Sequence, residues 1–300
     1  MAGFVTAVTL AAVRSGYETA QGPPELNSGS LGELTLGPSQ AHQAAGGGSA
    51  DARGQRAISE AVMDSRLAAA LRPLVARDRG RIAVGVIDAN TGAEALYDWR
   101  PSFRTASIVK ADILAVLLLR AQQAGTRVTD RQAELAVPMI EDSNNKAAAD
   151  LWQMVGAAPA IASANGRLGL PHTVTALTRY WRLTRTTVAD QLRLLTDLTS
   201  RTSPLTAASR DYEIGLMEDV TASQQWGVSA AASPGTVFAV KNGWTSDHHL
   251  WVINSIGIVT HDGHRLLIAV LSSGQSSEAA GIAAVSAAAI TAARVITGAS

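Results

Sequence analysis

The sequence predicts an α+β fold: one antiparallel β-sheet flanked by an N-terminal and a C-terminal helix, with an all-helical lobe inserted between the strands. Three observations support this prediction. β-Rich runs occur only within residues 81–99 and 236–273, the segment between them has helical character, and the chain closes with a long Ala-rich run. Since both groups of strands can pair in one sheet, we expect a single domain over residues 55–300.

The first part of that domain contains one helix and two strands. Residues Ile58–Ala76 carry apolar side chains at helical spacing. Arg81–Asp88 is a β-rich run, and Asn90–Gly92 supplies a turn into a second short strand at Glu94–Trp99. We therefore expect a helix followed by a β-hairpin.

The central segment begins with the strongly apolar run Ile108–Ala124, which predicts a helix. Thr129 and Gln132 match a capping box, and Ser203 followed by Pro204 has the form of an N-cap with proline at the first helical position. These signals predict that further helices begin at these two places.

Three late strands and a closing helix complete the domain. Residues 236–240, 250–259 and 265–271 alternate in polarity or run apolar, and Asp262-Gly263 has the form of a tight hairpin turn between the last two strands. The final helix is expected over residues 278–296, where alanine dominates.

Residues 1–54 have the composition of an export signal followed by a linker. Phe4–Val13 is apolar but shorter than the roughly 20 residues that span a bilayer, and no basic residue precedes it. Gly22–Gly54 is rich in Gly, Pro, Ser and Ala, which is typical of a disordered linker. We interpret the start as a degraded or truncated export signal. That predicts a secreted or cell-envelope protein, or a cytoplasmic one if the run is not a signal.

The overall composition excludes several classes of function. The formal net charge is zero and no cluster of basic residues occurs, so nucleic acid is not an expected partner. The chain has no cysteine, which excludes disulfides, thiolate metal sites and cysteine nucleophiles. His248 and His249 are adjacent on an expected strand and would point to opposite faces, so we expect no metal site and no other cofactor.

Lysine is rare in this chain: of 25 basic residues, only Lys110, Lys146 and Lys241 are lysines. A desolvated lysine can lose its proton and act as a base, which arginine does not do. Lys146 is expected to be a solvated residue at a helix start. The other two lie in short polar patterns that suggest chemistry.

Three such patterns occur one after another along the chain, and together they contain the groups that a serine nucleophile would need. Ser107 and Lys110 are three residues apart at a helix start, so hydroxyl and amine share one face. Ser143–Asn145 supplies a second hydroxyl and an amide between helical stretches, and Lys241–Gly243 closes a β-run with a cation and a glycine. Each pattern alone usually marks a cap or a turn, but together they indicate nucleophilic catalysis.

This set, S-x-x-K, S-x-N and K-x-G, resembles the active-site motifs of class A β-lactamases and penicillin-binding proteins. The resemblance covers residues 55–300, including RIAVGVIDANTG and the KNGW–LWVINSIGIV strands, and implies a β-lactamase/transpeptidase-like fold. It implies that Ser107 is the acylated nucleophile and Lys110 its base or proton shuttle. Other implied roles are proton relay by Ser143, attraction of the substrate carboxylate by Lys241, and substrate binding by Asn145, Asn242, Gly243 and Trp244, with the Ser107 and Trp244 N–H groups as oxyanion hole.

Two departures from the family pattern bear on function. Asn144 stands where the family usually has an acidic residue. Class A β-lactamases also carry a loop glutamate that activates the deacylating water, but residues 153–210 contain no glutamate, and Leu177–Trp181 looks like a shortened form of that loop. Asp190 and Asp197 fall within an expected helix and are interpreted as structural. We therefore expect intact acylation and slow deacylation.

Three functions follow as hypotheses. The first is a serine hydrolase that forms an acyl-enzyme with a β-lactam or a D-amino-acid peptide amide. The second is a carboxypeptidase- or transpeptidase-like penicillin-binding protein. The third is a non-catalytic cell-wall or ligand-binding protein, which would have no need for Lys110. In each case we expect a monomer without a membrane span, acting on a small-molecule or peptide partner.

Overall fold

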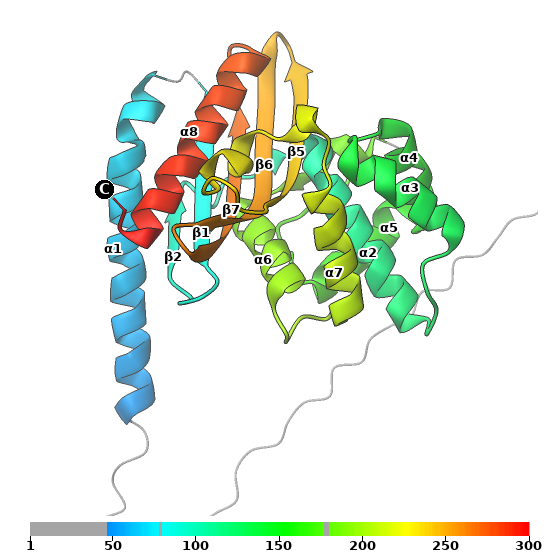
Figure 1. Cartoon of the computed structure of the whole chain (residues 1–300), viewed down its shortest axis with the longest axis horizontal. Helices are drawn as coiled ribbons and strands as arrows, with labels where there is room; N and C mark the ends of the chain where they lie inside the picture. The colour runs from blue at the N-terminus through cyan, green and yellow to red at the C-terminus, as the bar shows by residue number, and fades with distance from the viewer. Residues whose placement is uncertain (1–46, 78–79, 177–179, 300) are drawn as a thin grey trace, which may run out of the picture. The chain divides into compact units, whose positions relative to one another are not determined.

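The computed structural model describes residues 47–77, 80–176 and 180–299 (Figure 1). The expected export signal and most of the expected linker lie outside the described residues. The part of the linker that is described, residues 47–54, is helical and forms the beginning of α1 (Gly47–Arg77). The predicted boundary between linker and first helix was therefore too late in the chain.

A five-stranded antiparallel sheet with the order β2-β1-β7-β6-β5 forms the centre of the fold. The N-terminal hairpin thus pairs with the C-terminal strands through β1 and β7, as the sequence predicts. The strands are β1 (Arg81–Asp88), β2 (Glu94–Tyr97), β5 (Ala239–Asp247), β6 (Leu250–His261) and β7 (His264–Ser273).

The sequence predicted the turn between β6 and β7 correctly and the turn between β5 and β6 wrongly. Asp262 and Gly263 connect β6 to β7, both with positive φ (48° and 82°), as a two-residue hairpin requires. β5 was expected to end with the triplet Lys241–Gly243, but it continues to Asp247. His248 and His249 therefore form the turn into β6 instead of lying on a strand, and their backbones also have positive φ.

The terminal helices α1 and α8 (Glu278–Thr297) cover one face of the sheet (Figure 1). Leu67 and Leu71 of α1 are buried against the sheet in one hydrophobic cluster with five alanines of α8, namely Ala284, Ala288, Ala289, Ala292 and Ala293. Among the described residues, α8 is long and apolar enough to cross a membrane, but it packs on β1, β6 and β7 as a core helix does.

The helical lobe lies on the other side of the sheet (Figure 1). Its α6 packs directly on β1 and β7, where Gly85 leaves room for the side chains of Val188 and Leu192. The lobe consists of α2 (Val109–Gln123), α3 (Asp130–Glu141), α4 (Asn145–Met154), α5 (Ala157–Arg167), α6 (Val188–Thr199) and α7 (Ala207–Glu218).

One of the two helix starts predicted in the lobe is correct. Thr129 and Gln132 form the reciprocal capping box at the start of α3. The helix expected at Ser203-Pro204 begins instead at Ala207, because the Thr206 hydroxyl accepts the N-cap hydrogen bond from the Ser209 amide.

A second, two-stranded sheet connects the lobe to the first motif. β3 (Phe103–Arg104) pairs with β4 (Arg185–Thr186), and the amide of Thr105 donates to the carbonyl of Thr184. These contacts bring the short 3₁₀ helix η1 (Ala106–Ile108) next to η2 (Trp181–Leu183). Segments about 75 residues apart in the sequence thus meet at Ser107.

Candidate active site

Ser107 lies in the middle of η1, which leads directly into α2. The backbone of Ala106 is left-handed (φ 47°), a conformation that is costly for a residue with a Cβ and concentrates at functional sites. The buried side-chain amide of Asn254 on β6 donates to the carbonyls of the two residues before Ala106. The central sheet therefore fixes the position of the Ser107 turn.

Gly243 on β5 allows this turn to lie directly against the sheet. A Cβ at this position would lie 2.7 Å from the amide nitrogen of Ser107 and 2.6 Å from that of Ile108, closer than van der Waals contact permits. In the structure the glycine admits the Ser107 turn, and its role in substrate binding stays a prediction. The backbone of β5 thereby passes next to the Ser107 amide.

Lys110 is buried, and its amine connects the first two motifs. Its Nζ lies 3.0 Å from each of Ser107 Oγ, Ser143 Oγ and Asn145 Oδ1, and it also lies within hydrogen-bond distance of the Ser143 carbonyl. The indole ring of Trp181 covers another side of the amine, with its centroid 5.0 Å from Nζ.

The second motif lies in the connection between α3 and α4. Ser143 has a left-handed backbone (φ 55°), which turns its hydroxyl and carbonyl toward Lys110. The side chain of Asn144 accepts from the Ala147 amide and caps α4. The residue that departs from the family pattern therefore acts as a helix cap.

In the third motif the side chain of Lys241 faces the site, whereas that of Asn242 does not. Lys241 is buried, and its Nζ donates to Ser143 Oγ at 3.1 Å. Asn242 points to the opposite face of β5, where its amide donates to the carbonyls of Gln224 and Trp226. Because successive strand residues alternate between faces, the structure does not place the Asn242 side chain at the site, contrary to expectation.

Both lysines of the site have lowered pKa values. Burial, together with the nearby charges of Lys241 and Arg182, lowers the pKa of Lys110 to about 6. Burial alone lowers the pKa of Lys241 to about 7. Desolvation disfavours the charged amine, so near neutral pH Lys110 is mostly an unprotonated amine that can accept a proton.

A cavity of about 120 Å³ opens over the nucleophile. Trp244 forms part of its wall, with its ring edge-to-face against Trp226 at 5.8 Å between centroids. Sequence reasoning did not assign Trp181 or Arg182 to the site; both reach it from η2. The residues that line the cavity are Ala106, Ser107, Ser143, Asn145, Arg182 and Trp244.

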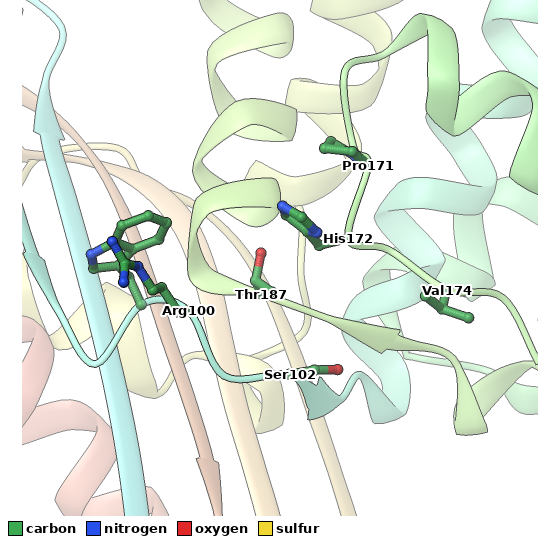
Figure 2. Close-up of a pocket in the computed structure, with 7 residues that line it drawn as sticks. Arg100, Ser102, Pro171, His172, Val174 and Thr187 are labelled. Atoms are coloured by element: carbon green, nitrogen blue, oxygen red, sulfur yellow. The ribbon is translucent and has the colours of Figure 1, made fainter.

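A larger cavity of about 460 Å³ lies elsewhere, beside β2 and α6 (Figure 2). Figure 2 shows His172 and Thr187 on one wall and Arg100 on the other, where the guanidinium stacks over the Trp99 ring at 5.0 Å. Its lining includes none of the motif residues, so its size does not make it the better candidate for catalysis. The lining residues are Trp99, Arg100, Ser102, Pro171, His172, Val174 and Thr187.

The acidic residues nearest to the missing glutamate in sequence have structural contacts, as expected. Asp190 accepts from the Thr173 hydroxyl at 2.7 Å and from the His172 amide at 2.8 Å. Asp197 pairs with Arg193 at 2.9 Å. Within the described ranges, no three His, Asp or Glu side chains gather as a metal site would require.

Lys146 is the one lysine that the motifs do not use. It forms an exposed ion pair with Asp150 at 2.8 Å, on the same helix. The expectation that it is a solvated residue at a helix start is confirmed.

Comparison with solved structures places this fold among the β-lactamases. One similar structure is a β-lactamase from Xanthomonas campestris, with a TM-score of 0.69 and 20% identity, covering 78% of this chain and 98% of that one. A class A β-lactamase from Bacteroides cellulosilyticus has a TM-score of 0.69 at 14% identity, covering 79% and 99%. A β-lactamase from Streptosporangium roseum has a TM-score of 0.67 at 19% identity, covering 78% and 99%. At these identities the likeness concerns the fold.

The sequence itself supplies the assignment to a family. A search of curated proteins finds no match. A family model for the beta-lactamase enzyme family matches residues 119–294, which include the second and third motifs and begin just after the first. That match spans more than half of the chain, and the structure places Ser107 and Lys110 against the matched part. The chain therefore belongs to the beta-lactamase enzyme family.

Proposed function

We propose that the protein is a serine acyl-transfer enzyme that forms an acyl-enzyme at Ser107 with a β-lactam or a D-amino-acid peptide amide and releases it slowly. The observation that carries this proposal is the shared hydroxyl of Ser143. Its Oγ lies within 3.1 Å of the Nζ atoms of both Lys110 and Lys241, while Lys110 also lies 3.0 Å from Ser107 Oγ. One network thus joins a nucleophile, a base and a cation.

Acylation begins when Ser107 Oγ attacks the carbonyl carbon of the substrate amide. The hydroxyl proton passes to the Lys110 amine, whose lowered pKa of about 6 leaves it unprotonated at neutral pH. Negative charge develops on the carbonyl oxygen, and the N–H groups of Ser107 and Trp244 would stabilise it. The C–N bond then breaks, the leaving nitrogen takes the proton of Ser143, and Lys110 returns a proton to Ser143.

Lys241 serves a different part of the substrate. It lies beside Ser143 and is buried, so in its protonated form it would attract the carboxylate that lies next to the leaving nitrogen in β-lactams. Asn145, with its carbonyl held by Lys110, would present its side-chain amide to the acyl part of the substrate. These roles place the reacting carbonyl in the cavity over Ser107.

Deacylation is the step that we propose to be slow. It needs a water held and activated beside the ester, and residues 153–210 provide no glutamate for this purpose. The two nearest acids in sequence, Asp190 and Asp197, are engaged in structural contacts. Loss of a positioned general base typically removes about 10²- to 10⁴-fold in rate, so the acyl-enzyme should accumulate.

A penicillin-binding-protein-like carboxypeptidase or transpeptidase is the second candidate. One observation favours it: the groups around the Lys110 amine are hydroxyl, carbonyl and amide oxygens and the Trp181 ring, and no carboxylate of the described residues is hydrogen-bonded to it. An enzyme that passes the acyl group to an amine does not need the loop glutamate.

Intact-protein mass spectrometry tests the proposal. Incubation with benzylpenicillin should add the mass of one penicillin to the wild-type protein, and Ser107→Ala should add none. Ser65→Ala, which removes an exposed serine of α1, is the matched control and should be labelled like the wild type. D-Amino-acid thioesters distinguish the second candidate, which should pass their acyl group to an added amine. Absence of any adduct with both kinds of substrate would favour a non-catalytic binding protein.

A further inference from the structure

Arg182 belongs to the cavity over Ser107 but to none of the three motifs. It lies in the middle of η2, between the buried residues Trp181 and Thr184. The Thr184 carbonyl accepts from both the amide and the hydroxyl of Thr105, only two residues before the nucleophile. The backbone that carries Arg182 is thus anchored to the turn that carries Ser107.

The charge of Arg182 is unopposed within the cavity. No acidic side chain lines the cavity, and among the described residues none forms an ion pair or a hydrogen bond with the Arg182 guanidinium. Burial is the main cause of the lowered pKa of Lys110, and the nearby charges of Lys241 and Arg182 lower it further. Arg182 borders the cavity from η2, whereas Lys241 reaches Ser143 from β5, so the two cations approach the site from different elements.

Since the site proposed above already assigns the carboxylate near the leaving nitrogen to Lys241, a second cation that borders the cavity from another element needs a different anion. We propose that Arg182 is a specificity-determining residue that favours acyl donors with a carboxylate on the acyl side chain. This inference rests on the proposed function. An arginine suits the role because its planar guanidinium binds a carboxylate through two parallel hydrogen bonds and stays charged at every relevant pH.

Three penicillins that differ only at one carbon of the acyl side chain provide the test. Benzylpenicillin has no charged group there, carboxybenzylpenicillin has a carboxylate, and aminobenzylpenicillin has an ammonium group. The measurement is the second-order rate constant of Ser107 acylation, followed by intact mass. In the wild type we expect the rate constant to be largest for the penicillin with the carboxylate, smaller for the uncharged one and smallest for the one with the ammonium group. The first two rate constants should differ by about tenfold, because hydrogen bonds between charged groups are the stronger ones.

Substitution then assigns the preference to one residue. Arg182→Gln should bring the three rate constants within about twofold of one another, Arg182→Lys should keep their order, and Arg201→Gln, an exposed arginine outside the cavity, should change nothing. Unchanged selectivity in Arg182→Gln would overturn the inference while leaving the proposed function intact. An equal loss for all three penicillins would also overturn it, because Arg182 would then bind the carboxylate common to them. Failure of all three to acylate the wild type would overturn the inference, and the proposed function falls with it only if D-amino-acid thioesters also leave no adduct.

Discussion

The amine of Lys110 lies against the face of the Trp181 indole ring, with Nζ 5.0 Å from the ring centroid. Trp181 is buried, so the ring excludes solvent from that side of the proposed base. A carboxylate in its place would lie beside Lys110 and could hold a water against the acyl ester. We therefore expect Trp181→Glu to speed release of the acyl group by about tenfold or more, measured as loss of the adduct mass with time.

Trp181→Gln is the control for this substitution, because it opens the same space without supplying a base. It should release the acyl group no more than a few times faster than the wild type. Equal acceleration by Gln and Glu would show that access of water, and not the missing base, limits deacylation. Both variants should first be checked for an unchanged acylation rate, which verifies that Ser107 and Lys110 remain in place.

A plot of the acylation rate against pH should be a narrow bell-shaped curve. Lys110 must be unprotonated to accept the Ser107 proton, so the rate should rise as pH passes its pKa of about 6. Lys241 must be protonated to attract the substrate carboxylate, so the rate should fall as pH passes its pKa of about 7. Lys241→Arg keeps the charge at all these pH values and should lose the falling limb. A falling limb that persists in Lys241→Arg would assign it to another group.

Asp112 on α2 and Glu213 on α7 form a buried acidic pair within the lobe, and neither lies at the proposed site. Burial, only partly offset by a hydrogen bond from Asn165, raises the pKa of Asp112 to about 7. Burial and the charge of Asp112 raise the pKa of Glu213 well above its usual value, and within the described part of the chain neither Glu213 oxygen has a hydrogen-bond partner. Both acids are therefore favoured in their protonated forms.

A raised pKa in the folded state means that stability is present at low pH and is lost as pH rises from about 4 through the folded value. Glu213→Gln should therefore raise the Tm above that of the wild type at pH 8, with a smaller difference at pH 5. Asp211→Asn, an exposed acid on the same helix, should leave the Tm unchanged at both pH values. A Glu213→Gln Tm below the wild type at pH 8 would show that the carboxylate has a stabilising partner in solution.

The central sheet could be predicted from the sequence because its signals are local. Arg81–Asp88 has the bounds expected from its β-rich run, and Asp262-Gly263 has the residues that a two-residue hairpin demands. The placement of Asn242 was also accessible, since it lies between Lys241 and Gly243 on one strand and must face away from them. We had treated the triplet as the end of a strand, where alternation no longer applies.

The contribution of η2 could not be predicted in this way. Trp181 and Arg182 reach the site because two-residue strands, Phe103–Arg104 and Arg185–Thr186, pair across a long stretch of sequence. Strands this short carry no periodic pattern, so the pairing is determined by tertiary contacts alone. The role of Asn254 also depends on tertiary contacts, because its buried amide fixes the Ser107 turn from a strand 150 residues later in the sequence than Arg104.

Pre-steady-state kinetics with a chromogenic β-lactam test the central claim most directly, because they separate the two chemical steps in one experiment. In the proposed function the Ser107–Lys110–Ser143–Lys241 network would carry out acylation, whereas residues 153–210 contain no glutamate that could activate a deacylating water. We predict a burst of about one equivalent per protein followed by turnover about 10²- to 10⁴-fold slower, and no burst in Ser107→Ala. Rapid multiple turnover without a burst would contradict the account, because it would require a deacylating base in the folded protein.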